Sequence, residues 1–124
     1  MVEIAQFCAG EPKTLPWLQR QALQDVNQYV RQAAVEAISQ GWAESLDLFA
    51  FFQDCAIHDP FEREEYYDEN PRHTALGAIA QYYPNRAETL PLLRERAAHD
   101  PDEQVREMAR RAIQRLEEKV NSEG

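Results

Sequence analysis

The residues that could carry chemistry are concentrated between His58 and His73. This segment holds two histidines and a run of carboxylates, a composition that could bind a metal ion. Zinc sites use closely spaced His or Cys ligands, and calcium loops place six or more oxygens in a defined order. Neither spacing occurs in this segment. It therefore predicts no metal site, and its simplest interpretation is a solvated acidic loop.

The same segment also carries aromatic residues beside charges, a composition typical of protein interfaces. Contact with a partner protein is therefore an alternative interpretation of this loop. The candidate contact residues are Phe61, Glu64, Glu65, Tyr66 and Tyr67.

A cysteine nucleophile is the other chemistry to consider. Cys55 and His58 are three residues apart on an expected helix and share a face, but no third group is placed to orient them. Cys55 occupies the same repeat position as Gln21 and Arg96, which favours an exposed thiol. It forms no CxxC motif with Cys8, and the chain has no glycine-rich phosphate loop. We therefore expect reduced cysteines, no cofactor, no small-molecule substrate and no enzyme activity.

The overall charge limits the classes of partner. The 124-residue chain has a formal net charge of −9, which repels the phosphates of nucleic acids and of anionic lipids. No segment is apolar over the length needed to cross a membrane, and the first residues lack the features of a signal peptide. We expect a cytoplasmic protein with a protein partner and no nucleic acid or membrane.

A repeated pattern indicates the elements that must position these residues. The pattern Arg-x-x-Ala-x-x-Ala-Ile occurs three times, starting at Arg31, Arg72 and Arg106. An apolar segment upstream of each copy ends in an aspartate: Asp25, Asp59 or Asp100. The Asp-to-Arg spacing is six residues in the first and third copies and thirteen in the second, so the second contains a seven-residue insertion. Without the insertion the period is 34 residues, which is typical of stacked two-helix units.

The apolar spacing predicts a single domain of three helix pairs, at about 14–42, 45–84 and 89–119, after a partial helix at 1–10. Thr14 is predicted to be an N-cap and Gly41 a C-cap. The side chains expected in the core are Leu15, Leu18, Ala22, Leu23, Val30, Ala34, Ala37 and Ile38 in the first unit, Phe49, Phe52, Ala56, Ile57, Ala75, Leu76, Ala78 and Ile79 in the second, and Leu90, Leu93, Ala97, Val105, Ala109, Ala112, Ile113 and Leu116 in the third.

Paired helices with this Asp–Arg spacing and Ala-x-x-Ala-Ile columns resemble HEAT repeats, and specifically the HEAT-like subtype named for phycobilisome lyases. The resemblance covers roughly residues 14–116. It implies an all-α, right-handed α-α superhelix of about three two-helix repeats.

The resemblance also implies a structural role for the repeated charged residues. In this family the turn aspartate and the second-helix arginine form a ladder between adjacent units, which here comprises Asp25, Arg31, Asp59, Arg72, Asp100 and Arg106. The second unit departs from the pattern because Pro71 replaces the valine of the other units. We therefore expect its second helix to start at or just before Arg72, which leaves open whether Asp59 joins the ladder or lies outside it.

Second helices line the inner surface of such arrays. The exposed positions expected on this surface are Gln32, Glu36, Gln40, His73, Gly77, Gln81, Glu107, Arg111 and Arg115. From these we select Gln32, Glu36, His73, Gln81 and Arg111 as further candidate partner contacts. The predicted function is a non-catalytic protein-interaction module or scaffold, either free-standing or the C-terminal segment of a larger repeat protein. The alternative, which the resemblance alone suggests, is a phycobilin lyase-type chromophore-handling subunit.

Overall fold

The computed structural model describes residues 13–123, and the side chains of residues 13–119. This part of the chain is all-α, as expected, and contains no strand. Its helices are α2 (Thr14–Gln24), α3 (Gln28–Gly41), α4 (Phe49–His58), α5 (Pro71–Tyr82), α6 (Thr89–His99) and α7 (Glu103–Glu123). The expected partial helix at 1–10 and the thiol of Cys8 lie outside the described residues.

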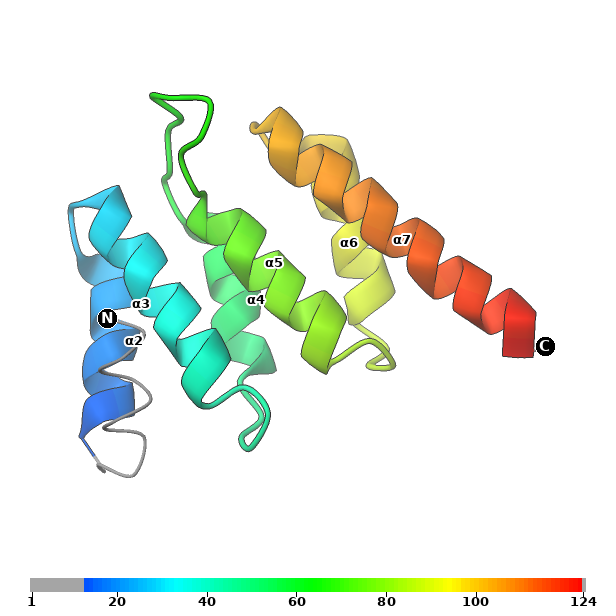
Figure 1. Ribbon diagram of the computed structural model, residues 1–124, viewed down its shortest axis with the longest axis horizontal. Helices are drawn as coiled ribbons and strands as arrows, with labels where there is room; N and C mark the ends of the chain where they lie inside the picture. Colours follow the sequence, from blue (N-terminus) through cyan, green and yellow to red (C-terminus); the bar gives the residue numbers. More distant parts are fainter. Residues whose placement is uncertain (1–12, 124) are drawn as a thin grey trace.

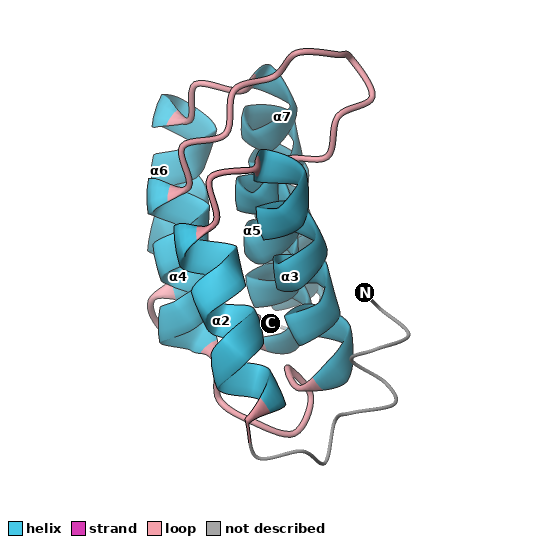
Figure 2. Ribbon diagram, turned by 90° about the vertical axis from the view of Figure 1, so that its left-hand side faces the viewer, coloured by secondary structure: helices cyan, strands magenta, loops and turns pink. Residues whose placement is uncertain are grey.

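The helices pair as three hairpins, α2 with α3, α4 with α5, and α6 with α7 (Figure 1). The hairpins lie side by side in chain order. Figure 2 shows α2, α4 and α6 in one layer and α3, α5 and α7 in the other. Within the second layer, α5 contacts both α3 and α7. On the side that faces away from the first layer, these three neighbouring helices therefore present one continuous face.

Each helix of the second layer starts at a short polar side chain. Asn27, Asn70 and Asp102 precede α3, α5 and α7, and each accepts a hydrogen bond from the backbone N–H two residues later, at 2.8, 2.8 and 3.0 Å. These bonds satisfy N–H groups that have no partner inside the helix. Pro71 follows Asn70 as the first residue of α5, where the missing N–H costs nothing.

The core lies between the two layers and follows the repeated pattern. Its alanines are at most 3% exposed, which confirms the predicted small columns: Ala34, Ala37, Ala75, Ala78, Ala109 and Ala112. Small side chains at these positions let neighbouring helices approach closely. Larger side chains such as Leu18, Phe52 and Leu76 are fully buried beside them. Burial of each such side chain contributes about 1.5–3 kcal/mol to folding.

Some sequence expectations were wrong at the edges of the helices. Lys13 is the N-cap of α2 and Thr14 is its first helical residue, while α3 ends at Gly41 and Trp42 takes the C-cap position. Leu23 is 44% exposed. Consecutive helical residues point about 100° apart, so Leu23 lies well round the helix from the buried Ala22. The remaining predicted core positions at the margin are half-buried: Leu15, Val30, Ile57, Leu90, Ala97, Ile113 and Leu116.

None of the described helices is both long enough and apolar enough to cross a lipid bilayer.

Candidate interaction face

Three aspartates end the helices of the first layer and form equivalent turns. Asp25, Asp59 and Asp100 directly follow α2, α4 and α6, and the backbone N–H of each donates back into its helix. Each carboxylate also accepts a hydrogen bond from the backbone N–H two residues later, at 2.8, 3.0 and 2.8 Å. A short aspartate side chain reaches this group easily and thereby holds the turn toward the second layer.

The arginines that open the repeated pattern join neighbouring hairpins. Nε and Nη2 of Arg31 donate to the carboxylate of Asp59 at 3.0 and 3.3 Å, and Arg72 makes the same pair with Asp100 at 2.9 and 3.2 Å. Nη1 of Arg31, Arg72 and Arg106 donates to the backbone carbonyl of the aspartate in its own hairpin, at 2.9, 2.7 and 2.6 Å. Each guanidinium therefore binds a turn of its own hairpin, and two of them also bind the next.

Asp59 belongs to this set of contacts, which decides the question that Pro71 had left open. Both inter-hairpin pairs span 28 residues of sequence, because the insertion separates Asp59 from Arg72 inside one hairpin and leaves the distance to the next unchanged. The paired side chains are buried, and no buried side-chain nitrogen or oxygen in the described region lacks a partner. We call the three aspartates and three arginines together the Asp–Arg ladder: Asp25, Arg31, Asp59, Arg72, Asp100 and Arg106. It holds the hairpins together and offers no open site.

We call the segment that carries the seven extra residues, 61–69, the insertion, and Arg63 anchors it to the third hairpin. The guanidinium of Arg63 pairs with Asp102 at 2.7 Å, and its Nη1 donates to the backbone carbonyls of Glu65, Tyr66 and Asp68. The Asp68 carboxylate accepts two backbone N–H groups of the same turn. Both bonds lower the pKa of the Asp68 carboxyl, and the bond from the Glu65 N–H has the larger effect. The backbone of the insertion is therefore organised around one buried carboxylate and one arginine.

The insertion is also tied to the first hairpin. The Gln28 side chain exchanges two hydrogen bonds with the backbone of Glu62, at 3.0 and 3.2 Å. Nε2 of Gln32 donates to the Glu69 carboxylate at 3.2 Å. The insertion thus bridges all three hairpins above the starts of α3, α5 and α7, which differs from a freely solvated loop.

Its aromatic residues divide into buried and exposed sets. Tyr66 and Tyr67 are 86% and 78% exposed at the tip, beside the exposed Glu64 and Glu65. Phe61 is only 5% exposed, which corrects its expected place among the partner contacts. It is buried because it directly follows the ladder turn at Asp59, and the Arg63 guanidinium lies 5.4 Å from the centre of its ring. The exposed candidates are therefore the two tyrosines and the two glutamates.

A groove of about 820 Å³ lies between the insertion and α7, and we call it the insertion groove. It is lined by Met108 and by polar and charged side chains from three elements. These are Arg63 and Tyr66 of the insertion, His73 of α5, and Asp102, Glu103, Gln104, Glu107, Met108, Arg111 and Arg115 at the start of and along α7.

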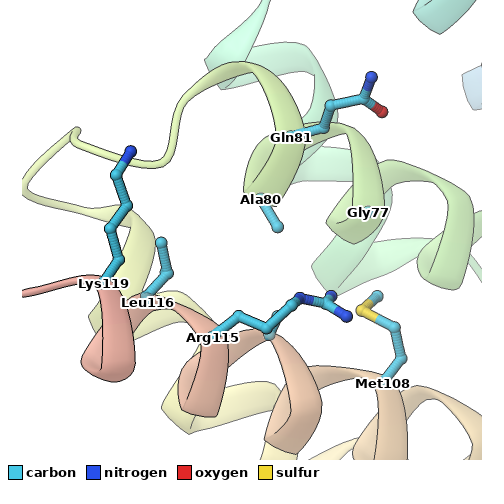
Figure 3. A pocket seen from close by; sticks show the side chains of 8 residues that line it. Gly77, Ala80, Gln81, Met108, Arg115, Leu116 and Lys119 are labelled. Carbon is cyan, nitrogen blue, oxygen red and sulfur yellow. The ribbon is translucent and has the colours of Figure 1, made fainter. Parts of the chain in front are cut away.

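A second groove of about 410 Å³ continues from it between the later turns of α5 and α7 (Figure 3). We call it the α5–α7 groove. Its lining is more apolar and is formed by Gly77, Ala80 and Gln81 of α5 and Met108, Ala112, Arg115, Leu116 and Lys119 of α7. Met108 and Arg115 line both grooves, so the two are contiguous.

A third groove, of about 450 Å³, runs between α3 and α5. Three of the predicted contacts, Glu36, His73 and Gln81, line this α3–α5 groove. His73 also lines the insertion groove, together with the predicted contact Arg111. Gln32 also lines the α3–α5 groove, but its side chain is buried, unlike the other predicted contacts on this face. It is 6% exposed because its amide is bound to Glu69 and to the Thr74 hydroxyl. Burial lowers the pKa of His73, which favours its neutral form in the groove.

Sequence reasoning missed Arg63 and Asp102, which position the insertion. The available signal was a single cation in an acidic segment, and no pattern pointed to its partner 39 residues away. Lys119 was also missed as part of the exposed face.

Cys55 does not lie at the surface, as its repeat position had suggested. Its side chain is 2% exposed, and burial raises the pKa of the thiol to about 12, with smaller contributions from Asp59 and Asp54. A thiol that stays protonated and inaccessible is a poor nucleophile.

Among the described residues, no three His, Cys, Asp or Glu side chains come together as metal ligands. No protein family model, curated protein or solved structure matches this chain. The candidate site is therefore defined by its own geometry: the exposed face of the second layer, with three connected grooves and the tyrosine tip of the insertion.

Proposed function

We propose that this chain is a non-catalytic protein-interaction module of the HEAT-like type, in which the three hairpins form a short right-handed α-α superhelix. The repeated pattern, the hairpins and the Asp–Arg ladder support this assignment. A stack of this kind presents an extended surface to a partner and needs no closed pocket.

The observation that carries the proposal is the continuity of the hollowed face. The α3–α5 groove, the insertion groove and the α5–α7 groove share lining residues, so they form one uneven surface across three helices. Two exposed tyrosines stand at its margin, and tyrosine is enriched at protein interfaces. Its mixed charge, with glutamates beside arginines, suits another protein better than a polyanion.

Site-specific photo-crosslinking in the source cell tests this function. A photoreactive amino acid at Arg111 or Gln81 samples the proposed face, and the same amino acid at Arg94 or Ala98 samples the exposed side of α6 as a matched control. We expect discrete crosslinked proteins from the first pair of positions and none of the same proteins from the second. Identical crosslinking patterns from the two sides, or none from either, would contradict the proposal.

A further inference from the structure

Gly77 lies in the middle of α5, where neither the backbone conformation nor packing within the chain requires a glycine. Glycine destabilises a helix interior relative to alanine. Within the described residues no glycine has a positive φ, so the backbone at Gly77 does not require one. A Cβ added to Gly77 would meet no atom within 4 Å. The space above this residue is open, and another chain can approach the α5 backbone closely there.

Gly77 lines both the α3–α5 groove and the α5–α7 groove, and the floor of the latter suits a ridge of apolar side chains. Ala80 and Ala112 are small, and Met108 and Leu116 are half-buried beside them. Figure 3 shows Gly77 and Ala80 facing Met108 and Leu116 across the groove. Amphipathic helices commonly dock in such grooves between two helices, and methionine adapts its shape to the side chains that enter.

The rim of this groove is positively charged, in contrast to the net charge of −9 for the whole chain. Arg115 and Lys119 lie one helical turn apart on α7 and line the groove. Within the described part of the chain neither forms an ion pair, whereas Arg111 one turn earlier pairs with Glu107. Two cations that pair with no described carboxylate, beside an apolar floor, complement carboxylates that flank an apolar stripe.

We propose that the α5–α7 groove binds an amphipathic helical segment of another protein, with small or flexible apolar side chains over Gly77 and carboxylates beside Arg115 and Lys119. This inference names the class of partner and rests on the function proposed above.

Selection from a random peptide library tests the inference on the full chain. The displayed peptides are long enough for about four helical turns, and those retained are sequenced. We expect apolar residues at helical spacing flanked by an excess of Asp and Glu. Binding of one selected peptide, measured by fluorescence anisotropy, should weaken at least about tenfold in Gly77→Trp, because the indole fills open space in the groove. Ala98→Trp, at an exposed position of α6, is the matched control and should bind normally. Circular dichroism checks that both variants are folded.

Charge reversal gives an independent readout. Selection on the Arg115→Glu, Lys119→Glu double variant should lose the acidic excess and favour Lys and Arg, a change that simple loss of stability would not produce. Peptides without an acidic excess, or binding that Gly77→Trp leaves unchanged, would overturn the inference.

The remaining outcomes separate this inference from the proposed function. If peptide binding is unchanged in Gly77→Trp but lost in the Tyr66→Ala, Tyr67→Ala double variant, the groove assignment is overturned and the proposed protein-interaction function is retained. Retention of no peptide would overturn the groove assignment, and photo-crosslinking would then decide on the module separately. Self-association seen by ultracentrifugation and abolished by Gly77→Trp would identify a second copy as the occupant and would also overturn the inference.

Discussion

Among the described residues, the buried arginines and aspartates that join neighbouring hairpins satisfy one another. The Arg72 guanidinium uses its donors on the carboxylate of Asp100 and on the carbonyls of Asp59 and Phe61. Removing charges from water is costly, so such a pair adds little net stability compared with apolar residues. The pair instead fixes the geometry of the stack, because the planar guanidinium can bind both turns in only one relative arrangement.

Breaking the pair should therefore be much more harmful than its net contribution suggests. Arg72→Ala removes the two-bonded partner of the buried Asp100 carboxylate, which of its charged partners keeps only the 3.3 Å contact with Arg96, and should lower the free energy of unfolding by about 3 kcal/mol, the lower end of the range for a broken buried pair. Urea denaturation measures this. Arg94→Ala, which removes the exposed pair with Glu117, is the control and should cost less than about 1 kcal/mol. Equal losses in the two variants would show that the ladder is not needed to hold the hairpins.

The thiol of Cys55 should be unreactive in the native protein. In a Cys8→Ser background, labelling by a thiol reagent at neutral pH should be slow, because the side chain is 2% exposed and its pKa is raised to about 12. Labelling should become rapid in denaturant. Fast labelling of the folded chain would mean that α4 opens readily.

At the scale of elements, the insertion behaves as a folded part of the array. Periodicity predicted the helix pairs and the alanine columns well, because each depends on local spacing alone. It failed for Phe61, Gln32 and Cys55. The first two are buried by contacts of the insertion. Cys55 is buried in α4, and so is Arg96 at the same repeat position in α6, whereas Gln21 is half-buried, so the expectation of an exposed column was wrong for two of its three members. Insertion contacts join residues up to 39 apart, and a repeat pattern contains no information about the residues that interrupt it.

Arg63 should control the order of this element. Arg63→Ala removes the pair with Asp102 and the three hydrogen bonds that Nη1 donates to backbone carbonyls. We expect faster amide hydrogen exchange across residues 61–69 with little change in the buried turns of α3 and α5, because the ladder remains intact. Unchanged exchange in the insertion would contradict the role assigned to Arg63, and Arg94→Ala again serves as the control.

At the scale of the whole molecule, pH should act through several shifted groups at once. The pKa values of Asp47, Asp68, Glu95 and Glu107 are lowered in the fold, chiefly by hydrogen bonds from arginines or backbone N–H groups, and that of Asp47 falls to about 2. Burial lowers the pKa of His73 as well. In each case the unfolded chain binds more protons than the folded chain in the interval between the two pKa values, so stability rises with pH there.

Stability should therefore decline in two stages as the solution is acidified. The first begins below about pH 6.5, where unfolded His73 takes up a proton, and the second below about pH 4.5, where unfolded carboxyls do so. Urea midpoints measured between about pH 7 and pH 3 check this, and His73→Gln should remove only the first stage. A midpoint that stays constant over the whole range would refute both assignments.

The equal 28-residue spans of the two ladder pairs have a practical consequence. The segment between Asp59 and Arg72 leaves and rejoins the array inside one hairpin, so its length does not enter the register between hairpins. The free-energy cost of closing a longer loop grows only slowly with length. Foreign sequence, such as a recognition peptide or a small tag, could therefore replace the tip around Tyr66 and Tyr67 while the three hairpins keep their pairing. The interruption in the repeat is thus the natural place to graft new binding specificity onto this scaffold.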